Sequence, residues 1–228
     1  MVRINQIFIG CPWEVIRQKY EQVCTEIEEI LPVQFIILGR DPSQDAEGLM
    51  DVIKQKLEQS ESAVFDASGG NPNVSLEFGY CEALGKRRIL TLFNHGKYIR
   101  RLSGRGDEQS IISDLAGKIR NPYKTTKGLK KILLAHIDRN GYVARFKIAC
   151  AKERWGKRIQ KLATKIIILS SKRSRVALQD LINDTTGFFP NKSPGEIYNI
   201  ITKLKNHQLL ETSRGPGGGV SIPELPNE

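Results

Sequence analysis

The segment DASGGNPNVSLEFGYCEALGK, residues 66–86, contains an acidic side chain, Glu77, in a setting that suits chemistry. The segment predicts a strand that ends at Asp66, a tight turn at Gly69 and Gly70, and then a helix. Backbone N–H groups at the start of such a helix can hold an anion. Glu77 is therefore a candidate catalyst, a candidate ligand-binding group, or a carboxylate that only gains from the positive end of a helix dipole.

Other candidate residues end the preceding strands at the same edge of the predicted sheet. In a doubly wound sheet, ligands bind outside the carboxyl ends of the strands, and Arg40 at this edge is expected to pair with a phosphate. The chain has no G-x-G-x-x-G fingerprint and no phosphate-loop lysine motif, which disfavours dinucleotide redox chemistry and nucleoside-triphosphate hydrolysis. The predicted nucleotide-binding residues are Gly10, Cys11, Pro12, Gly39, Arg40, Asp41, Gly69, Gly70 and Asn73.

Alternating strand and helix patterns over the first 137 residues must position these groups. They predict an α/β fold, a flavodoxin-like or Rossmann-like parallel sheet joined by right-handed crossovers, in a domain over 1–138. The predicted strands are 6–10, 33–39, 62–68 and 87–94. The predicted helices are 13–30, 46–59, the helix that carries Glu77, and stretches near 110–119 and 125–138.

The pattern changes after Gly141. Residues 142–171 predict one long basic helix, straight or bent, so 139–172 is expected to link two domains. A helix over 176–184, a turn, and a helix over 193–208 that starts with a capping box at Ser193 follow. Two short strands then flank RGPGGG, and this order predicts a C-terminal winged helix-turn-helix domain over 173–228.

Charge is unevenly spread along the chain, whose formal net charge is +10. Residues 1–150 hold 22 Lys and Arg against 18 Asp and Glu, whereas residues 151–228 hold 13 against 7. The excess of positive charge in the shorter piece suits contact with a polyanion, and it equally suits a solvated surface.

The 66–86 segment resembles the D-x-T-G-x-N-P-N-V-x-x-E-L-G-x-A-x-A-x-G-K segment of bacterial TIR-like domains and their nucleoside 2-deoxyribosyltransferase-like relatives. ISDLAGKIRNPYKTTKGLKKIL, 112–133, is similar to their D-L-x-G-x-x-x-x-P-Y stretch, so the resemblance covers about 4–137. It implies cleavage of the bond between a ribose and a base by Glu77. Asp66, at the end of the strand before, is a second candidate catalytic residue that would orient the site. A carboxylate there would stabilise the oxocarbenium-like transition state, hold ribose hydroxyls or attack covalently.

The stretch ITKLKNHQLLETSRGPGGGVSIP, 201–223, resembles the recognition helix and wing of winged-helix regulators, within a domain of about 155–224. Iron–sulfur-sensing repressors have a similar wing, but this stretch lacks the cysteines that hold their cluster. The resemblance implies duplex DNA as a partner, and docking of protein is the alternative. The candidate DNA-binding residues are Lys192, Tyr198, Asn199, Lys203, Lys205, Arg214 and Gly217.

Together these features predict a nucleotide-binding TIR-like domain with N-glycosidase capacity, coupled to a DNA-binding domain, in nucleotide signalling or antiphage defence. NAD or another nucleotide is the expected ligand, and no cofactor or metal is expected. The alternatives are a nucleotide-sensing transcription regulator without turnover and an assembly scaffold. A cytoplasmic homodimer without membrane contact is expected. Cys11 as a nucleophile is a weaker hypothesis, because only His95, His136 and His207 could activate it.

Overall fold

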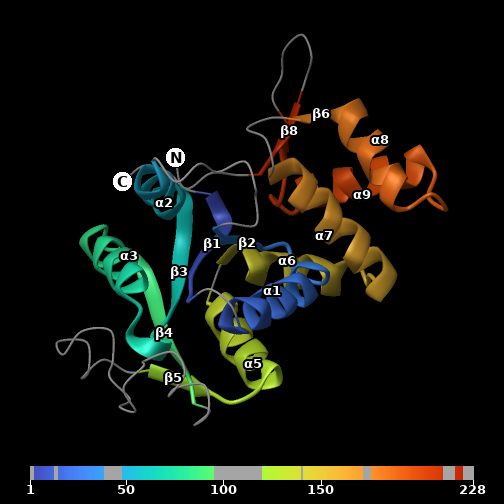
Figure 1. Ribbon diagram of the computed structural model, residues 1–228. Helices are drawn as coiled ribbons and strands as arrows, with labels where there is room; N and C mark the ends of the chain where they lie inside the picture. Colours follow the sequence, from blue (N-terminus) through green and yellow to red (C-terminus); the bar gives the residue numbers. More distant parts are fainter. Residues whose placement is uncertain are drawn as a thin grey trace. The chain divides into compact units, whose positions relative to one another are not determined.

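The computed structural model describes residues 3–12, 15–38, 48–94, 120–139, 141–171, 176–212 and 219–222 (Figure 1). The chain divides into two compact units. The first contains Gln6–Glu26 and Phe35–His136, and the second combines Ile137–Glu228 with Arg3–Asn5 and Ile27–Gln34.

The first unit is built on a five-stranded parallel sheet in the order β2-β1-β3-β4-β5, which confirms the predicted flavodoxin-like α/β fold. Parallel pairing places Asp66 of β3 opposite Thr91 of β4, and Phe93 of β4 opposite Tyr123 of β5. The strands are β1 (Arg3–Gly10), β2 (Gln34–Ile37), β3 (Ser60–Asp66), β4 (Arg87–Phe93) and β5 (Arg120–Tyr123).

The edge strand β5 has no counterpart in the sequence analysis. Its sequence, RNPY, is short, lacks apolar alternation and contains Pro122, which has no N–H to donate. Proline is tolerated in a strand at the edge of a sheet, where one side needs no partner. The helix predicted near 110–119 lies outside the described residues.

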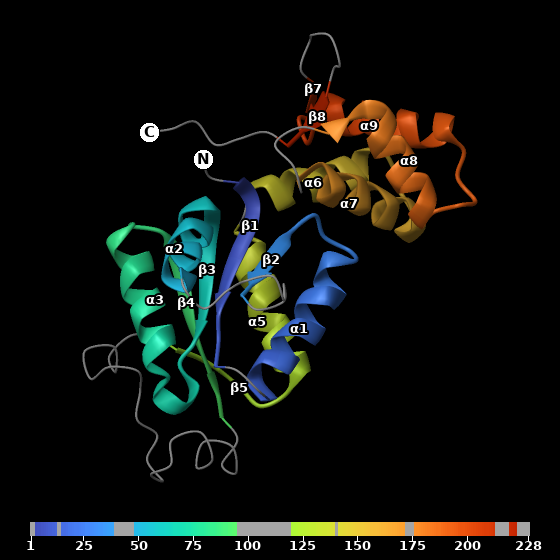
Figure 2. The ribbon, with the colours of Figure 1, turned by 45° about the horizontal axis from the view of Figure 1, so that its top comes forward.

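Two helical layers cover this sheet, with α2 and α3 on one face and α1 and α5 on the other (Figure 2). Under α2 and α3, Phe8 and Phe65 of the sheet join Leu57 and Phe78 of the helices in one buried cluster. On the other face, the Lys130 ammonium of α5 lies 2.7 Å from the Glu26 carboxylate of α1. The helices are α1 (Val15–Glu28), α2 (Leu49–Gln59), α3 (Pro72–Ala83) and α5 (Thr126–Ile137).

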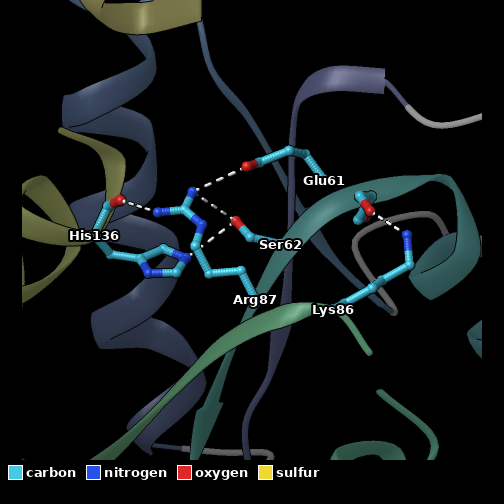
Figure 3. Close-up of polar contacts among 6 residues, drawn as sticks. Glu61, Ser62, Lys86, Arg87 and His136 are labelled. Atoms are coloured by element: carbon cyan, nitrogen blue, oxygen red, sulfur yellow. Dashed lines mark hydrogen bonds and ion pairs between the residues drawn. The ribbon is translucent and has the colours of Figure 1, made fainter. Parts of the chain in front are cut away.

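A polar cluster fastens the amino ends of β3 and β4 to the last turn of α5 (Figure 3). Arg87 Nη2 lies 3.1 Å from both carboxylate oxygens of Glu61, and Nη1 donates to the His136 carbonyl at 2.9 Å. His136 Nε2 lies 3.0 Å from Ser62 Oγ. Since a helix C-terminus leaves carbonyls without intrahelical partners, Arg87 both caps α5 and holds the two strands together.

In its described residues, the second unit combines four helices with a three-stranded antiparallel sheet. The strand order of this sheet is β6-β8-β7. The capping box predicted at Ser193 is present: Ser193 Oγ accepts from the Glu196 N–H at 3.2 Å, and Glu196 Oε2 accepts from the Ser193 N–H at 3.0 Å. The elements are α6 (Gly141–Lys152), α7 (Lys157–Ser171), β6 (Val176–Ala177), α8 (Leu178–Phe188), α9 (Pro194–Asn206), β7 (Glu211–Thr212) and β8 (Gly219–Ser221).

The sequence predicts one long helix, straight or bent, over 142–171, and the structure divides this segment. The chain forms two helices there, α6 and α7, and Arg154 between them has left-handed backbone, with φ of 52°. Both helices contribute to the core of the second unit, where Phe146 and Ile166 are buried with Leu204 of α9. The apolar faces of α6 and α7 need this burial, so the segment folds back into a core.

None of the helices in the described residues has the combination of length and apolar character that a membrane crossing requires.

Candidate functional site

The strand order places the topological switch point of the sheet between β1 and β3. The connection that leaves the carboxyl end of β1 leads to β2 on one side of β1. The connection that leaves the carboxyl end of β3 leads to β4, in the opposite direction, so the two connections diverge. Ligands of doubly wound sheets bind at such a switch point. Gly10 ends β1 and Asp66 ends β3, so the sequence-predicted residues of these two strands meet at this edge.

Glu77 packs against the end of β1. A Cβ atom at Gly10 would lie 2.5 Å from Glu77 Oε2 and 2.5 Å from the Phe65 ring, so the carboxyl occupies space that only glycine leaves open. Glu77 is 9% exposed, and its buried Oε2 atom has no hydrogen-bond partner among the residues that the structure describes. An unpaired buried carboxyl oxygen is costly and is therefore an expected contact point for a ligand.

The helix-dipole interpretation of Glu77 fails on position. Helix α3 begins at Pro72, and its first turn contains no acidic residue. The dipole effect falls off within the first turn. Burial instead raises the pKa of Glu77 from 4.5 to about 7, so that it can gain or lose a proton near neutral pH.

Asp66, in contrast, is fully engaged with protein groups. It is 0% exposed, its Oδ1 accepts from the Ser68 N–H at 3.0 Å, and its Oδ2 accepts from the hydroxyls of Tyr123 at 2.7 Å and Tyr20 at 3.1 Å. Burial raises the pKa of Asp66, while these hydrogen bonds oppose the rise. Asp66 thus presents no free oxygen to a ligand, and we assign it a positioning role in place of the catalytic one.

The side chains that surround Asp66 were missed by the sequence analysis. The Tyr20 hydroxyl lies 2.5 Å from Thr91 Oγ1, and the Ser68 hydroxyl accepts from the Phe93 N–H at 2.7 Å. A tyrosine on the apolar face of a helix was the available signal for Tyr20, because a buried tyrosine hydroxyl needs a polar partner.

The turn before α3 is the tight one that the sequence predicts, since Gly69 and Gly70 have φ of 72° and 58°. The expectation of free N–H groups at the start of α3 is wrong for two of them. The N–H groups of Asn73 and Val74 donate to Asn71 Oδ1 at 2.9 and 3.3 Å. Asn71 is an N-cap residue, so the protein itself occupies the donors that an anion would use.

Cys11 is half-buried beside this carboxyl edge, and Pro12 after it is buried. Burial, and then the charges of Asp66 and Glu77, raise the pKa of the Cys11 thiol. A thiol that stays protonated is a poor nucleophile, which disfavours the cysteine hypothesis. In the described part of the chain, no three His, Cys, Asp or Glu side chains gather as metal ligands would. Gly39, Arg40, Asp41 and His95 lie outside that part.

The candidate DNA-binding residues divide into paired and exposed groups. Lys192 and Lys203 lie 2.6 Å from the carboxylates of Glu196 and Glu153. Glu153 also contacts His207, at 3.0 Å. The exposed candidates on α9 are Tyr198, which is 53% exposed, Asn199 and Lys205. Arg214 and Gly217 lie outside the described residues.

Comparison of the sequence with protein-family models and with curated proteins finds no match. Among solved structures, the chain is similar to Clostridium botulinum CMP N-glycosidase, BcmB, at 14% identity and a TM-score of 0.36, over 57% of this chain and 98% of that chain. It is also similar to a chain of Drosophila ORC bound to AT-rich DNA and Cdc6, at 12% identity and a TM-score of 0.30, over 96% of this chain and 82% of that chain. At these TM-scores, neither similarity carries an argument about function.

The Glu77→Gln variant should gain stability relative to the wild type as the pH rises. The pKa of Glu77 is about 7 in the folded chain, against 4.5 in the unfolded chain. The stability that the wild type gains from holding this proton is therefore complete below pH 4.5 and is lost as the pH rises through about 7. The difference in unfolding free energy between variant and wild type should therefore grow by roughly 3 kcal/mol from pH 4 to pH 8. Urea unfolding at both pH values measures it. The control variant Asp51→Asn replaces an exposed carboxylate and should change stability little at either pH. If the change in stability between pH 4 and pH 8 were the same for both variants, this result would contradict the burial of Glu77.

The Gly10→Ala variant should displace the Glu77 carboxyl and the Phe65 ring. The new methyl group would meet both at 2.5 Å, which should cost about 1–3 kcal/mol of stability as overpacking. Gly79 of α3 is the matched control, because a Cβ atom added there would have nothing within 4 Å, and Gly79→Ala should stabilise the helix by about 0.5–1 kcal/mol. Thermal unfolding compares the two variants. A Gly10→Ala protein as stable as Gly79→Ala would show that the close approach is not enforced.

Proposed function

We propose that the first unit binds a nucleotide or nucleoside and cleaves its N-glycosidic bond, with Glu77 as the catalytic carboxyl. The observation that carries this proposal is a buried Glu77 Oε2 atom that has no hydrogen-bond partner among the described residues, at the β1/β3 switch point of a flavodoxin-like sheet. The resemblance of residues 66–86 to TIR-like and deoxyribosyltransferase-like segments supports the same residue. NAD and nucleoside monophosphates are the first candidate substrates.

In this reaction the bond between the ribose anomeric carbon and the base nitrogen breaks, and the bonding electrons leave with the base. The ionised form of Glu77 stabilises the positive charge that develops on the ribose, or attacks the anomeric carbon. Water then adds its hydroxyl group to the anomeric carbon. Its proton goes to solvent when nicotinamide leaves as a neutral base, and to the base nitrogen when the base leaves as an anion. Within the described part of the chain, the Glu77 Oε2 atom has no hydrogen bond that substrate binding would have to break. A ribose hydroxyl that donates to this atom would satisfy it, so binding energy and catalysis would use the same group.

Asp66 serves this reaction indirectly. Through Ser68 it shapes the turn that begins α3, and through Tyr20 and Tyr123 it holds that turn against α1 and β5. The position of Glu77 on α3 thus depends on Asp66, although Asp66 itself contacts only protein groups.

Base release from NAD, or from one of a panel of nucleosides and nucleoside monophosphates, should require ionised Glu77. Since the pKa of Glu77 is about 7 in the free protein, kcat/KM should rise with pH and level off above about pH 7. Chromatography of the released base, with and without duplex DNA, measures the rate, which Glu77→Gln should reduce by at least about a hundredfold. Glu82→Gln, an exposed position on the same helix, should leave it unchanged.

If no base is released under any condition but nucleotide binding is saturable, the enzymatic proposal fails. The first unit would then be a nucleotide sensor that acts through its differential affinity for two states of the protein.

We also propose that the second unit binds duplex DNA through α9, as a winged helix-turn-helix domain would. The apolar side of α9 is buried through Ile197, Ile201 and Leu204, while Tyr198, Asn199 and Lys205 face outward at helical spacing. An outward face with an amide, a cation and an aromatic ring offers base-edge and phosphate contacts to a major groove. A homodimer would present two such faces to successive half-sites.

The Lys205→Gln variant should bind duplex DNA more weakly, and the salt dependence of its affinity should become less steep. Loss of one phosphate contact lowers the slope of log K against log salt by about 0.9. Fluorescence anisotropy of a labelled duplex at several salt concentrations measures this slope. Lys131→Gln removes the same charge from an exposed position on α5 of the first unit and should leave the slope unchanged. Equal slopes for wild type and Lys205→Gln would contradict a phosphate contact at Lys205.

A further inference from the structure

The second unit contains a pocket of about 560 Å³ that is remote in sequence from the Glu77 site. It lies between the turn after α1 and the turn that joins α6 to α7, and all the residues that line it belong to the second unit. Its buried walls are formed by Leu31, Phe146, Cys150 and Trp155. A volume of this size and a largely apolar wall are typical of sites for small molecules.

An arginine stands at the edge of this pocket in a backbone conformation that favours glycine. Arg154 has φ of 52° and follows the end of α6. The Trp155 N–H donates to the Cys150 carbonyl at 3.0 Å and the Arg154 N–H donates to the Ala151 carbonyl at 3.2 Å, which together form a Schellman motif. Glycine usually occupies this left-handed position, because a side chain there is strained. The side chain of Arg154 is therefore kept at a conformational cost.

The charged residues that line the pocket, Lys147 and Arg154, are both cationic. Arg154 is exposed, lines the pocket and forms no ion pair with any described acidic residue. The Lys147 ammonium is a second cation in the lining, although Asp138 pairs with it. Ile30, which is 41% exposed, adds apolar surface to the same lining. An apolar wall beside an unpaired guanidinium complements a molecule with an apolar body and one anionic group.

We propose that this pocket is a second ligand site, which takes a small amphipathic anion such as a medium-chain or aromatic carboxylate. The apolar body lies against Phe146 and Trp155, and the carboxylate pairs with Arg154. Phe146, Cys150 and Trp155 share one buried cluster with Leu204 of α9. Occupancy of the pocket therefore stabilises the unit that carries α9, since a ligand that binds only the folded state shifts the unfolding equilibrium.

Tryptophan fluorescence tests the site in the full-length protein. The chain has two tryptophans, Trp13 and Trp155, so Trp13→Phe leaves Trp155 as the sole reporter in the pocket wall. Octanoate should change this fluorescence saturably and should raise the melting temperature. Octanol and octylamine, which have the same chain without the negative charge, should bind at least about tenfold more weakly. No saturable change with octanoate, or equal binding of octanoate and octanol, would overturn the proposal.

The Arg154→Gly variant removes the guanidinium and keeps the left-handed backbone, so it tests the side chain alone. Because glycine favours the left-handed conformation, this variant should fold at least as well as the wild type while it binds octanoate at least about tenfold more weakly. Gln208→Gly is the matched control, because Gln208 has φ of 55° after the end of α9 and does not line the pocket. It should leave octanoate binding unchanged. Wild-type affinity for octanoate in Arg154→Gly would overturn the role of Arg154.

Discussion

The buried carboxyl of Asp66 holds together the elements on which the Glu77 site depends. Its two oxygens accept hydrogen bonds from the turn after β3, from Tyr20 of α1 and from Tyr123 of β5. A carboxyl removed from water is tolerated only when such donors replace its hydration. Since the same turn leads directly into α3, the network sets where that helix begins and hence where Glu77 lies.

The two carboxyls of this unit differ because their surroundings differ. Asp66 has donors at both oxygens, whereas the buried Oε2 atom of Glu77 has no donor among the described residues and lies against Gly10. Burial raises the pKa of both groups, but hydrogen bonds oppose the rise only at Asp66. Separate environments of this kind commonly assign separate roles to acidic residues, one structural and one reactive.

The second unit buries its helices around a single core. The apolar sides of α6, α7, α8 and α9 form this core with the small sheet, so that α9 turns a polar face outward. The break between α6 and α7 makes this core possible. In one continuous helix, the two halves would extend away from each other and could not bury their apolar sides in the same cluster. The left-handed Arg154 at that break also places a cation beside the pocket.

Local patterns in the sequence determined the fold class, the strands β1 to β4, the glycine turn before α3, the capping box of α9 and the candidacy of Glu77. These features depend on neighbouring residues, whose spacing and turn chemistry are visible along the chain. Only the tertiary structure decided that Asp66 accepts hydrogen bonds from Tyr20 and Tyr123, which lie 46 and 57 residues away along the chain. It also decided that Gly10 leaves room for the Glu77 carboxyl, and that residues 142–171 fold back as two helices. The physical reason is that periodicity reports which face of an element is buried, but the partner of that face comes from distant parts of the chain.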